Sequence, residues 1–193
     1  MAVTKGFGPD SVRAALAAGL TDVGENYAAE LEAKVAALEG DPALGEAVWH
    51  FLGAVQRNKV AALASRVGLW QSVAREAEGA RIARFRPGAA ALVQVDTTGL
   101  TGRNGCPPSE VAELTGRLRD HGLDVRGLMT VAAPGREAAE AAFATVARLA
   151  DELGLEERSM GMSDDLEAAV EAGTTMVRVG RALFGDRPGV AAR

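Results

Sequence analysis

The sequence predicts an α/β fold in the form of a single (β/α)8 barrel. Short apolar runs typical of strands alternate with amphipathic stretches typical of helices, and eight such strand runs fit along the chain. No linker or shift in composition divides the 193 residues, so we expect one domain covering residues 1–193. Because a barrel of this type usually needs roughly 250 residues, an open doubly wound sheet stays as the alternative architecture.

The strands are predicted from period-two alternation and apolar runs, most clearly at 90–96, where Gln94 is the only polar residue before Asp96. In chain order the predicted strands cover residues 1–5, 22–26, 49–53, 69–73, 90–96 and 125–131, then a run that begins at Ser159, then 175–180.

The helices are predicted from apolar stripes with recognisable ends. Pro9 stands where helices begin, and Gly19 and Gly122 stand where they end. The predicted helices cover 10–19, a segment ending near 38, 58–67, a segment ending near 85, 109–121 and 136–153, with short ones after Ser163 and Gly180. Residues 97–108 carry three glycines and are predicted to be a flexible barrel loop, since they match neither common glycine fingerprint for phosphate binding.

Composition excludes several classes of protein. The net charge of −5 disfavours nucleic acid or an anionic membrane as a partner. Cys106 is the only cysteine, so neither an intrachain disulfide nor a cysteine-rich metal site is expected. The N-terminus lacks the basic and apolar regions of a signal peptide, and no apolar run reaches the roughly 20 residues of a membrane span. We therefore expect a cytoplasmic protein.

In a barrel of this kind the chemistry lies at the C-terminal ends of the strands. Polar residues fall at these ends throughout the sequence, and a barrel would bring them onto one rim. They are Lys5, Asn26, His50, Ser72, Asp96, Ser163 and Arg178.

Two of these residues carry charges that call for a partner. Lys5 ends an apolar strand, where a desolvated amine can attack an aldehyde, although a solvated lysine near a frayed terminus is the commoner situation. Arg178 alternates with Val177 and Val179 and points inward, so it needs a carboxylate, a phosphate or a ring nitrogen. The sequence leaves two interpretations of Arg178 open, an internal ion pair with Asp96 and a bound ligand.

Other polar residues have ordinary structural explanations. His50 alternates with two aromatic residues and is expected to be a core histidine whose hydrogen bonds are satisfied, while His121 is expected to cap a helix C-terminus. Asn58 is expected to cap a helix N-terminus.

The end of the chain suggests a phosphate site. Gly180 follows a strand and precedes a helical turn, so backbone N–H groups at Gly180 and Arg181 are available to an anion. Ser163 is expected either to cap its helix or to donate its hydroxyl to the same anion. Asp164 and Asp165 argue against an anion bound squarely on that other helix.

Several motifs fall together in the order and spacing of one family. They are Ala2-Val3-Thr4-Lys5, Gly24-Glu25-Asn26-Tyr27, the stretch from Trp49 to Lys59, Arg126-Gly127-Leu128-Met129-Thr130, Ser159-Met160-Gly161-Met162-Ser163, and the stretch from Val177 to Gly185. On these motifs the whole chain resembles the pyridoxal phosphate homeostasis proteins of the YggS/PROSC type, which are similar to the barrel half of alanine racemase.

The resemblance implies a role for each matching residue. Lys5 would carry pyridoxal 5′-phosphate (PLP) as a Schiff base, and Arg178 would face its pyridine nitrogen. Ser163, Gly180 and Arg181 would hold the phosphate. Asn26 and Asn58 would line the same mouth.

The chain departs from the family pattern at Asp96, where asparagine is commoner, at Leu100 in place of an acidic residue, at Arg103 in place of lysine, and at Arg158 in place of an apolar residue. The family also usually begins with a helix and the earlier half of the first strand. Here the chain starts four residues before Lys5, so either the start of the gene is placed too late or this member lacks the helix, and we expect Lys5 to stand on a poorly anchored strand.

The implied site favours binding over catalysis. A cationic Arg178 only donates hydrogen bonds, so it keeps the pyridine nitrogen unprotonated and weakens PLP as an electron sink. Racemisation needs acid/base groups on both faces of the substrate, and Tyr27 is the only tyrosine. We therefore expect a monomeric protein of PLP homeostasis that delivers the cofactor to apo-enzymes. A weak amino-acid racemase and a barrel that binds another phosphate ester are the alternatives.

Overall fold

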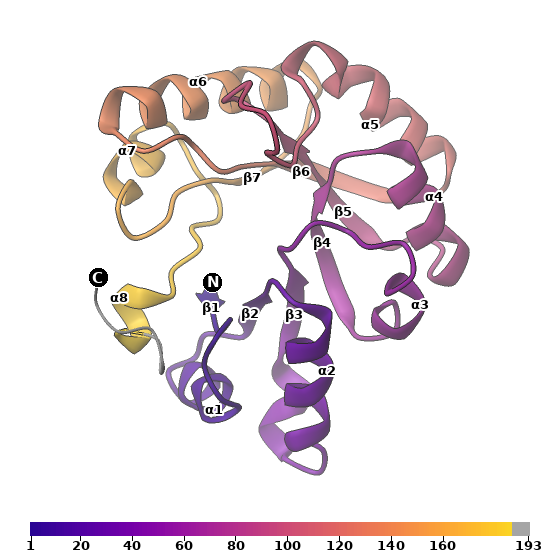
Figure 1. Cartoon of the computed structure of the whole chain (residues 1–193), viewed down its shortest axis with the longest axis vertical. Coiled ribbons are helices and arrows are strands. Elements are labelled where there is room, and N and C mark those ends of the chain that lie inside the picture. Colours follow the sequence, from indigo (N-terminus) through magenta and orange to yellow (C-terminus); the bar gives the residue numbers. More distant parts are fainter. Residues whose placement is uncertain (187–193) are drawn as a thin grey trace.

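The structure is a computed structural model that describes residues 1–186, and it contains one parallel sheet whose strands follow each other in chain order (Figure 1). The sheet has seven strands, β1 (Ala2–Val3), β2 (Asp22–Glu25), β3 (Val48–Phe51), β4 (Val67–Val73), β5 (Ala90–Val95), β6 (Asp124–Thr130) and β7 (Glu157–Ser159). This order is that of a barrel wall. It rules out the doubly wound alternative, in which the strand order reverses.

The predicted eighth strand occupies the expected place without forming a regular strand. Residues 176–179 make one isolated bridge to β7, Ser159 to Met176, and one to β1, Ala2 to Val179. The backbone N–H of Val3 donates to the Val179 carbonyl over 2.8 Å, which joins the last segment to the first strand. The segment 176–179 therefore closes the ring that Figure 1 shows, and the prediction of a barrel is confirmed.

The helices form a layer outside the sheet (Figure 1). They are α1 (Asp10–Ala17), α2 (Ala28–Ala37), α3 (Val60–Leu63), α4 (Glu76–Phe85), α5 (Val111–Asp120), α6 (Arg136–Glu152), α7 (Leu166–Glu171) and α8 (Arg181–Phe184), with 3-10 turns at Pro42–Glu46 and Pro108–Glu110. The helix predicted at 58–67 is the largest error, since only Val60–Leu63 is helical and β4 already begins at Val67.

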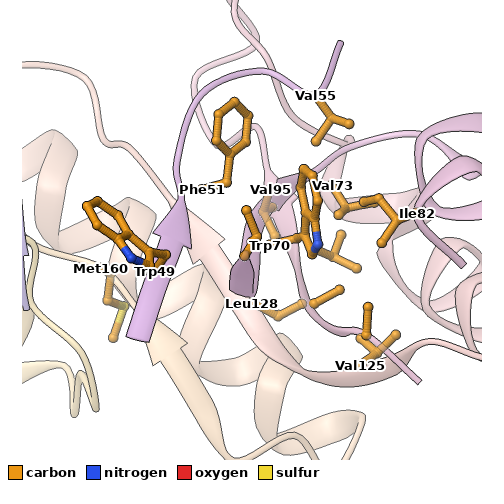
Figure 2. Packing of buried hydrophobic residues seen from close by; sticks show 14 of the residues in the cluster. Trp49, Phe51, Val55, Trp70, Val73, Ile82, Val95, Val125, Leu128 and Met160 are labelled. Atoms are coloured by element: carbon orange, nitrogen blue, oxygen red, sulfur yellow. The ribbon is translucent and has the colours of Figure 1, made fainter. Parts of the chain in front are cut away.

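The main core lies between the sheet and the helices. Phe51 and Trp70 extend from neighbouring strands into this layer, where their ring centroids are 5.5 Å apart, and Ile82 of α4 packs nearby (Figure 2). Burial of such side chains contributes about 1.5–3 kcal/mol each.

The inside of the barrel is smaller and partly polar. Its apolar part is the cluster of Leu69, Ala90, Leu92 and Met129. Polar side chains share this interior, among them Gln71, Ser159 and Arg178. None of the described helices is both long and apolar enough to cross a membrane.

Candidate functional site

Lys5 lies two residues beyond the end of β1, at the C-terminal mouth of the barrel, and is half-buried. The backbone on both sides of it is held. Thr4 is fully buried, its N–H donates to the Gly24 carbonyl over 3.0 Å, and its hydroxyl donates to Glu25 Oε1 over 2.6 Å. The N–H of Gly6 donates to Glu30 Oε2 over 2.7 Å. The expectation that Lys5 stands on a poorly anchored strand is therefore wrong.

Lys34 provides a further contact behind Lys5. It is only 4% exposed, and its Nζ donates to the Thr4 carbonyl over 2.6 Å and forms an ion pair with Glu25. Burial raises the pKa of Glu25, and the hydrogen bonds from Lys34 and Thr4 oppose that rise. The helical, polar sequence around Lys34 and Lys59 predicts that both side chains are protonated and solvated, and this prediction is wrong for Lys34, which is buried. Lys59 is exposed as expected.

Arg178 is buried in the barrel interior, 5% exposed, as its inward position in the strand pattern predicted. One guanidinium nitrogen donates to the Ser159 carbonyl over 2.6 Å and to the Ser159 hydroxyl over 2.9 Å, and the other donates to the Thr130 carbonyl over 2.6 Å. Burial lowers the pKa of Arg178 to about 10, while Asp165 opposes the shift, so the side chain remains a cation at neutral pH.

The alternative of an ion pair between Arg178 and Asp96 is wrong. Asp96 follows β5, and its Oδ1 accepts the hydroxyl of Thr98 over 2.7 Å and the N–H of Thr98 over 2.9 Å. These hydrogen bonds lower the pKa of Asp96, although burial acts in the opposite direction. Asp96 therefore orders its own loop.

A chain of hydrogen bonds connects Arg178 with the other end of the barrel. The hydroxyl of Ser159 donates to Gln71 Oε1 over 2.6 Å, Gln71 Nε2 lies 2.7 Å from His50 Nδ1, and His50 Nε2 lies 2.9 Å from Asp22 Oδ1. His50 is therefore a core histidine with satisfied hydrogen bonds, as predicted, and it lies below the mouth. Gln71 was missed in the sequence, although a polar residue inside an apolar strand was a signal for it.

The three predicted phosphate anchors lie near the closing segment. Gly180 packs against β1 so closely that a Cβ there would be 3.1 Å from the Val3 carbonyl oxygen, and α8 starts at the next residue. The guanidinium of Arg181 pairs with Asp164 over 2.7 Å, which leaves its backbone N–H as the group for an anion. Ser163 is half-buried and does not cap α7, because Asp165 stands at the cap position and its Oδ1 accepts the Met162 N–H over 2.5 Å.

Asn26 and Asn58 differ in their placement. Asn26 follows β2 directly and is half-buried, and Gly53 packs against it. Asn58 is exposed and lines an open pocket of about 450 Å³ with Arg57 and Arg81. Lys59 stands at the N-cap position of α3, so the prediction of Asn58 as the cap is wrong.

Ser72, which was predicted at the rim, and Tyr27, which follows β2, differ in their exposure. Ser72 is fully buried, and its hydroxyl donates to the Gly53 carbonyl. Tyr27, the only tyrosine, is 61% exposed at the start of α2. No cluster of three or more His, Cys, Asp or Glu side chains suited to a metal ion exists among the described residues.

The closed parallel barrel, with Lys5 after β1 and the buried Arg178 on the closing segment, belongs to the alanine racemase class of barrels. The family profile described as "Alanine racemase, N-terminal domain" matches residues 1–188. An alanine racemase from Clostridium difficile 630 has the same fold, with a TM-score of 0.79 at 16% identity over 97% of this chain and 52% of that one.

Other relatives are much more similar to this chain in sequence than the alanine racemase is. The chain is 40% identical to the pyridoxal phosphate homeostasis protein of Pseudomonas aeruginosa, over 97% of this chain and 84% of that one, and 42% identical to that of Deinococcus radiodurans, over 95% and 87%. The structure of PipY from Synechococcus elongatus with PLP bound superposes with a TM-score of 0.83 at 33% identity, over 96% and 91%. The chain belongs to the family of pyridoxal phosphate homeostasis proteins, as the sequence motifs predicted.

Proposed function

We propose that this chain binds PLP at the C-terminal mouth of its barrel and acts as a cytoplasmic monomer in PLP homeostasis, delivering the cofactor to apo-enzymes. The names of its relatives and the PLP-bound structure of PipY support this proposal. The observation that carries it is the placement of Lys5 and Arg178. Lys5 follows β1, and Arg178 lies on the adjacent closing segment, which the bridge from Ala2 to Val179 joins to β1.

The residues at the mouth fit the three recognisable parts of PLP. An amine suits the aldehyde, a cationic donor suits the pyridine nitrogen, and backbone N–H groups suit the phosphate. Lys5 supplies the amine, Arg178 the cationic donor, and Gly180 and Arg181 the N–H groups, with Ser163 assisting. Asn26, directly after β2, would line the mouth, and Asn58 would contribute from the open pocket that it lines with Arg57 and Arg81.

Covalent binding would need only Lys5 and the cofactor. When bound, PLP supplies an aldehyde that amines attack and a ring that withdraws electrons. Lys5 would hold the cofactor through its Nζ, because an amine suits the aldehyde that PLP supplies. The buried backbone of Thr4 would keep the attacking amine at the mouth.

The site is better suited to holding PLP than to catalysis with it. Arg178 has a pKa of about 10 and is a donor at neutral pH, so it does not protonate the pyridine nitrogen. Because Tyr27 is exposed at the start of α2, it is a poor candidate for the second acid/base group that racemisation needs.

A spectroscopic titration tests the function. Adding PLP to the purified protein is expected to produce the absorption band of lysine-bound PLP, and Lys5→Ala is expected to lose this band while it still binds PLP without a covalent link. Exchange of the Cα proton of alanine in heavy water is expected to stay at the background rate.

Two results would contradict the proposal. Binding of simple phosphate esters as tight as that of PLP, without any band, would favour a different phosphate-ester protein. Enzyme-dependent proton exchange that is lost in Lys5→Ala would favour a racemase.

A further inference from the structure

The residues around Lys5 form a cluster that no binding role yet explains. Glu25 of β2 is fully buried, Lys34 of α2 is 4% exposed, and Glu30 lies one helical turn before Lys34. A buried ion pair is costly to assemble, because both charges lose their hydration. The presence of such a pair next to the proposed cofactor lysine therefore calls for a functional explanation.

The contacts of the cluster supply this explanation, because they converge on the two peptide units that flank Lys5. On the N-terminal side, Lys34 donates to the carbonyl oxygen of Thr4, and Glu25 accepts the Thr4 hydroxyl. On the C-terminal side, Glu30 accepts the N–H of Gly6 over 2.7 Å. Gly6 has a φ of 75°, so the chain turns sharply just after Lys5.

We propose that Glu25, Glu30 and Lys34 are positioning residues that fix the backbone of Lys5 and thereby aim its amine at the aldehyde of PLP. The inference rests on the proposed function. The cluster takes no part in holding the phosphate or the ring, so its loss slows covalent capture and leaves non-covalent binding intact. A displacement of about 1 Å at a reacting group lowers a rate by up to roughly a hundredfold.

The test separates capture from binding. Capture is the rate at which the absorption band forms after mixing with PLP, and non-covalent binding is the dissociation constant for pyridoxine 5′-phosphate, which has an alcohol in place of the aldehyde. Glu30→Ala removes the acceptor for Gly6 and keeps the buried pair. We expect capture to slow roughly tenfold to a hundredfold with an unchanged dissociation constant. Glu30→Gln keeps an acceptor oxygen and is expected to restore most of the rate.

Two further variants complete the design. Glu25→Leu with Lys34→Met replaces both members of the buried pair, which proteins tolerate far better than the loss of one, and is expected to slow capture in the same way. Glu140→Ala removes an exposed carboxylate on α6 that pairs with Arg136, and is expected to capture PLP at the wild-type rate.

These measurements distinguish failure of the inference from failure of the proposed function. Capture at the wild-type rate in Glu30→Ala and in the double variant would overturn the inference. An equal loss of capture and of pyridoxine phosphate binding would also overturn it, because the cluster would then only support the fold. A wild-type protein that binds pyridoxine phosphate and forms no band would instead refute the covalent role of Lys5 itself.

Discussion

Among single residues, Arg178 contributes most to the chemistry of the candidate site, because it is a buried positive charge. It is a buried cation that is satisfied by neutral acceptors, two carbonyl oxygens and a hydroxyl, and no carboxylate pairs with it in the described part of the chain. Its positive charge is therefore not neutralised by a direct partner. An electron-rich ring nitrogen is a suitable group to meet it.

Replacing Arg178 is expected to weaken PLP binding. A hydrogen bond from a charged group contributes about 1.5–3 kcal/mol, so Arg178→Ala is expected to raise the dissociation constant roughly ten- to a hundredfold. It is also expected to lower the melting temperature of the cofactor-free protein, because the carbonyls of Thr130 and Ser159 lose their donor. Ser163→Ala is expected to reduce the free energy of PLP binding by only about 0.5–1.5 kcal/mol, because a neutral hydroxyl is lost. PLP titrations and thermal melts of each variant measure these effects. Wild-type affinity in Arg178→Ala would contradict the proposed role.

His50 is expected to make stability depend on pH. Burial lowers the pKa of His50 below its ordinary value of 6.5, against the opposing effect of Asp22. As the pH falls below 6.5, the unfolded chain takes up a proton that the folded protein still refuses, so the free energy of unfolding decreases. His50→Gln lacks this titrating group. Between pH 7 and pH 5 its free energy of unfolding is therefore expected to decrease less than that of the wild type. Urea denaturation at several pH values measures the slope, and equal slopes would show that His50 is not buried in its neutral form.

At the scale of elements, close contacts between backbone segments shape the mouth. Gly53 follows β3, and a Cβ built there would lie 1.9 Å from the carbonyl oxygen of Asn26. The two chain segments after β2 and β3 therefore touch without room for a side chain. This contact keeps Asn26 in place at the rim.

A pair of glycine variants tests this contact. Gly53→Ala must push the segments apart, and is expected to destabilise the protein by about 1–3 kcal/mol and to weaken PLP binding. Gly116→Ala lies within α5, where a Cβ meets nothing within 4 Å, and is expected to stabilise the protein by about 0.5–1 kcal/mol without affecting PLP. Chemical denaturation and PLP titration of both variants measure the two effects. A Gly53→Ala protein as stable as the wild type would show that the segments after β2 and β3 move apart at little cost in free energy.

The sequence predicted those features that depend on local patterns. Period-two alternation placed Arg178 inside the barrel, and apolar runs placed the strands within a few residues. The burial of Lys34 was missed because its partner Glu25 belongs to another element, and a helix pattern of alanines and charges does not reveal which lysine turns inward. The contact between Ser159 and Gln71, 88 residues apart, was beyond prediction for the same reason. The third helix was overestimated because Val67 continues an apolar helical pattern while serving as the first residue of β4.

At the scale of the whole molecule, closure of the barrel brings the two ends of the described chain together. The N-terminal amine of Met1 donates to the Val177 carbonyl over 2.9 Å, and Val179 donates to the Met1 carbonyl over 3.2 Å. Lys5 and Arg178 are distant in sequence and lie on either side of this seam. The site therefore exists only in the closed barrel.

The central claim is that this barrel holds PLP through Lys5. The sequence has three lysines, Lys5, Lys34 and Lys59, which makes the claim simple to test. The protein is loaded with PLP, reduced with borohydride so that the link becomes permanent, digested and mapped by mass spectrometry. We expect the adduct on Lys5 alone, because Lys34 is buried in its ion pair and Lys59 is exposed to solvent on α3's N-terminal side. An adduct on Lys34 or Lys59, or no adduct in a protein that binds PLP tightly, would contradict the claim.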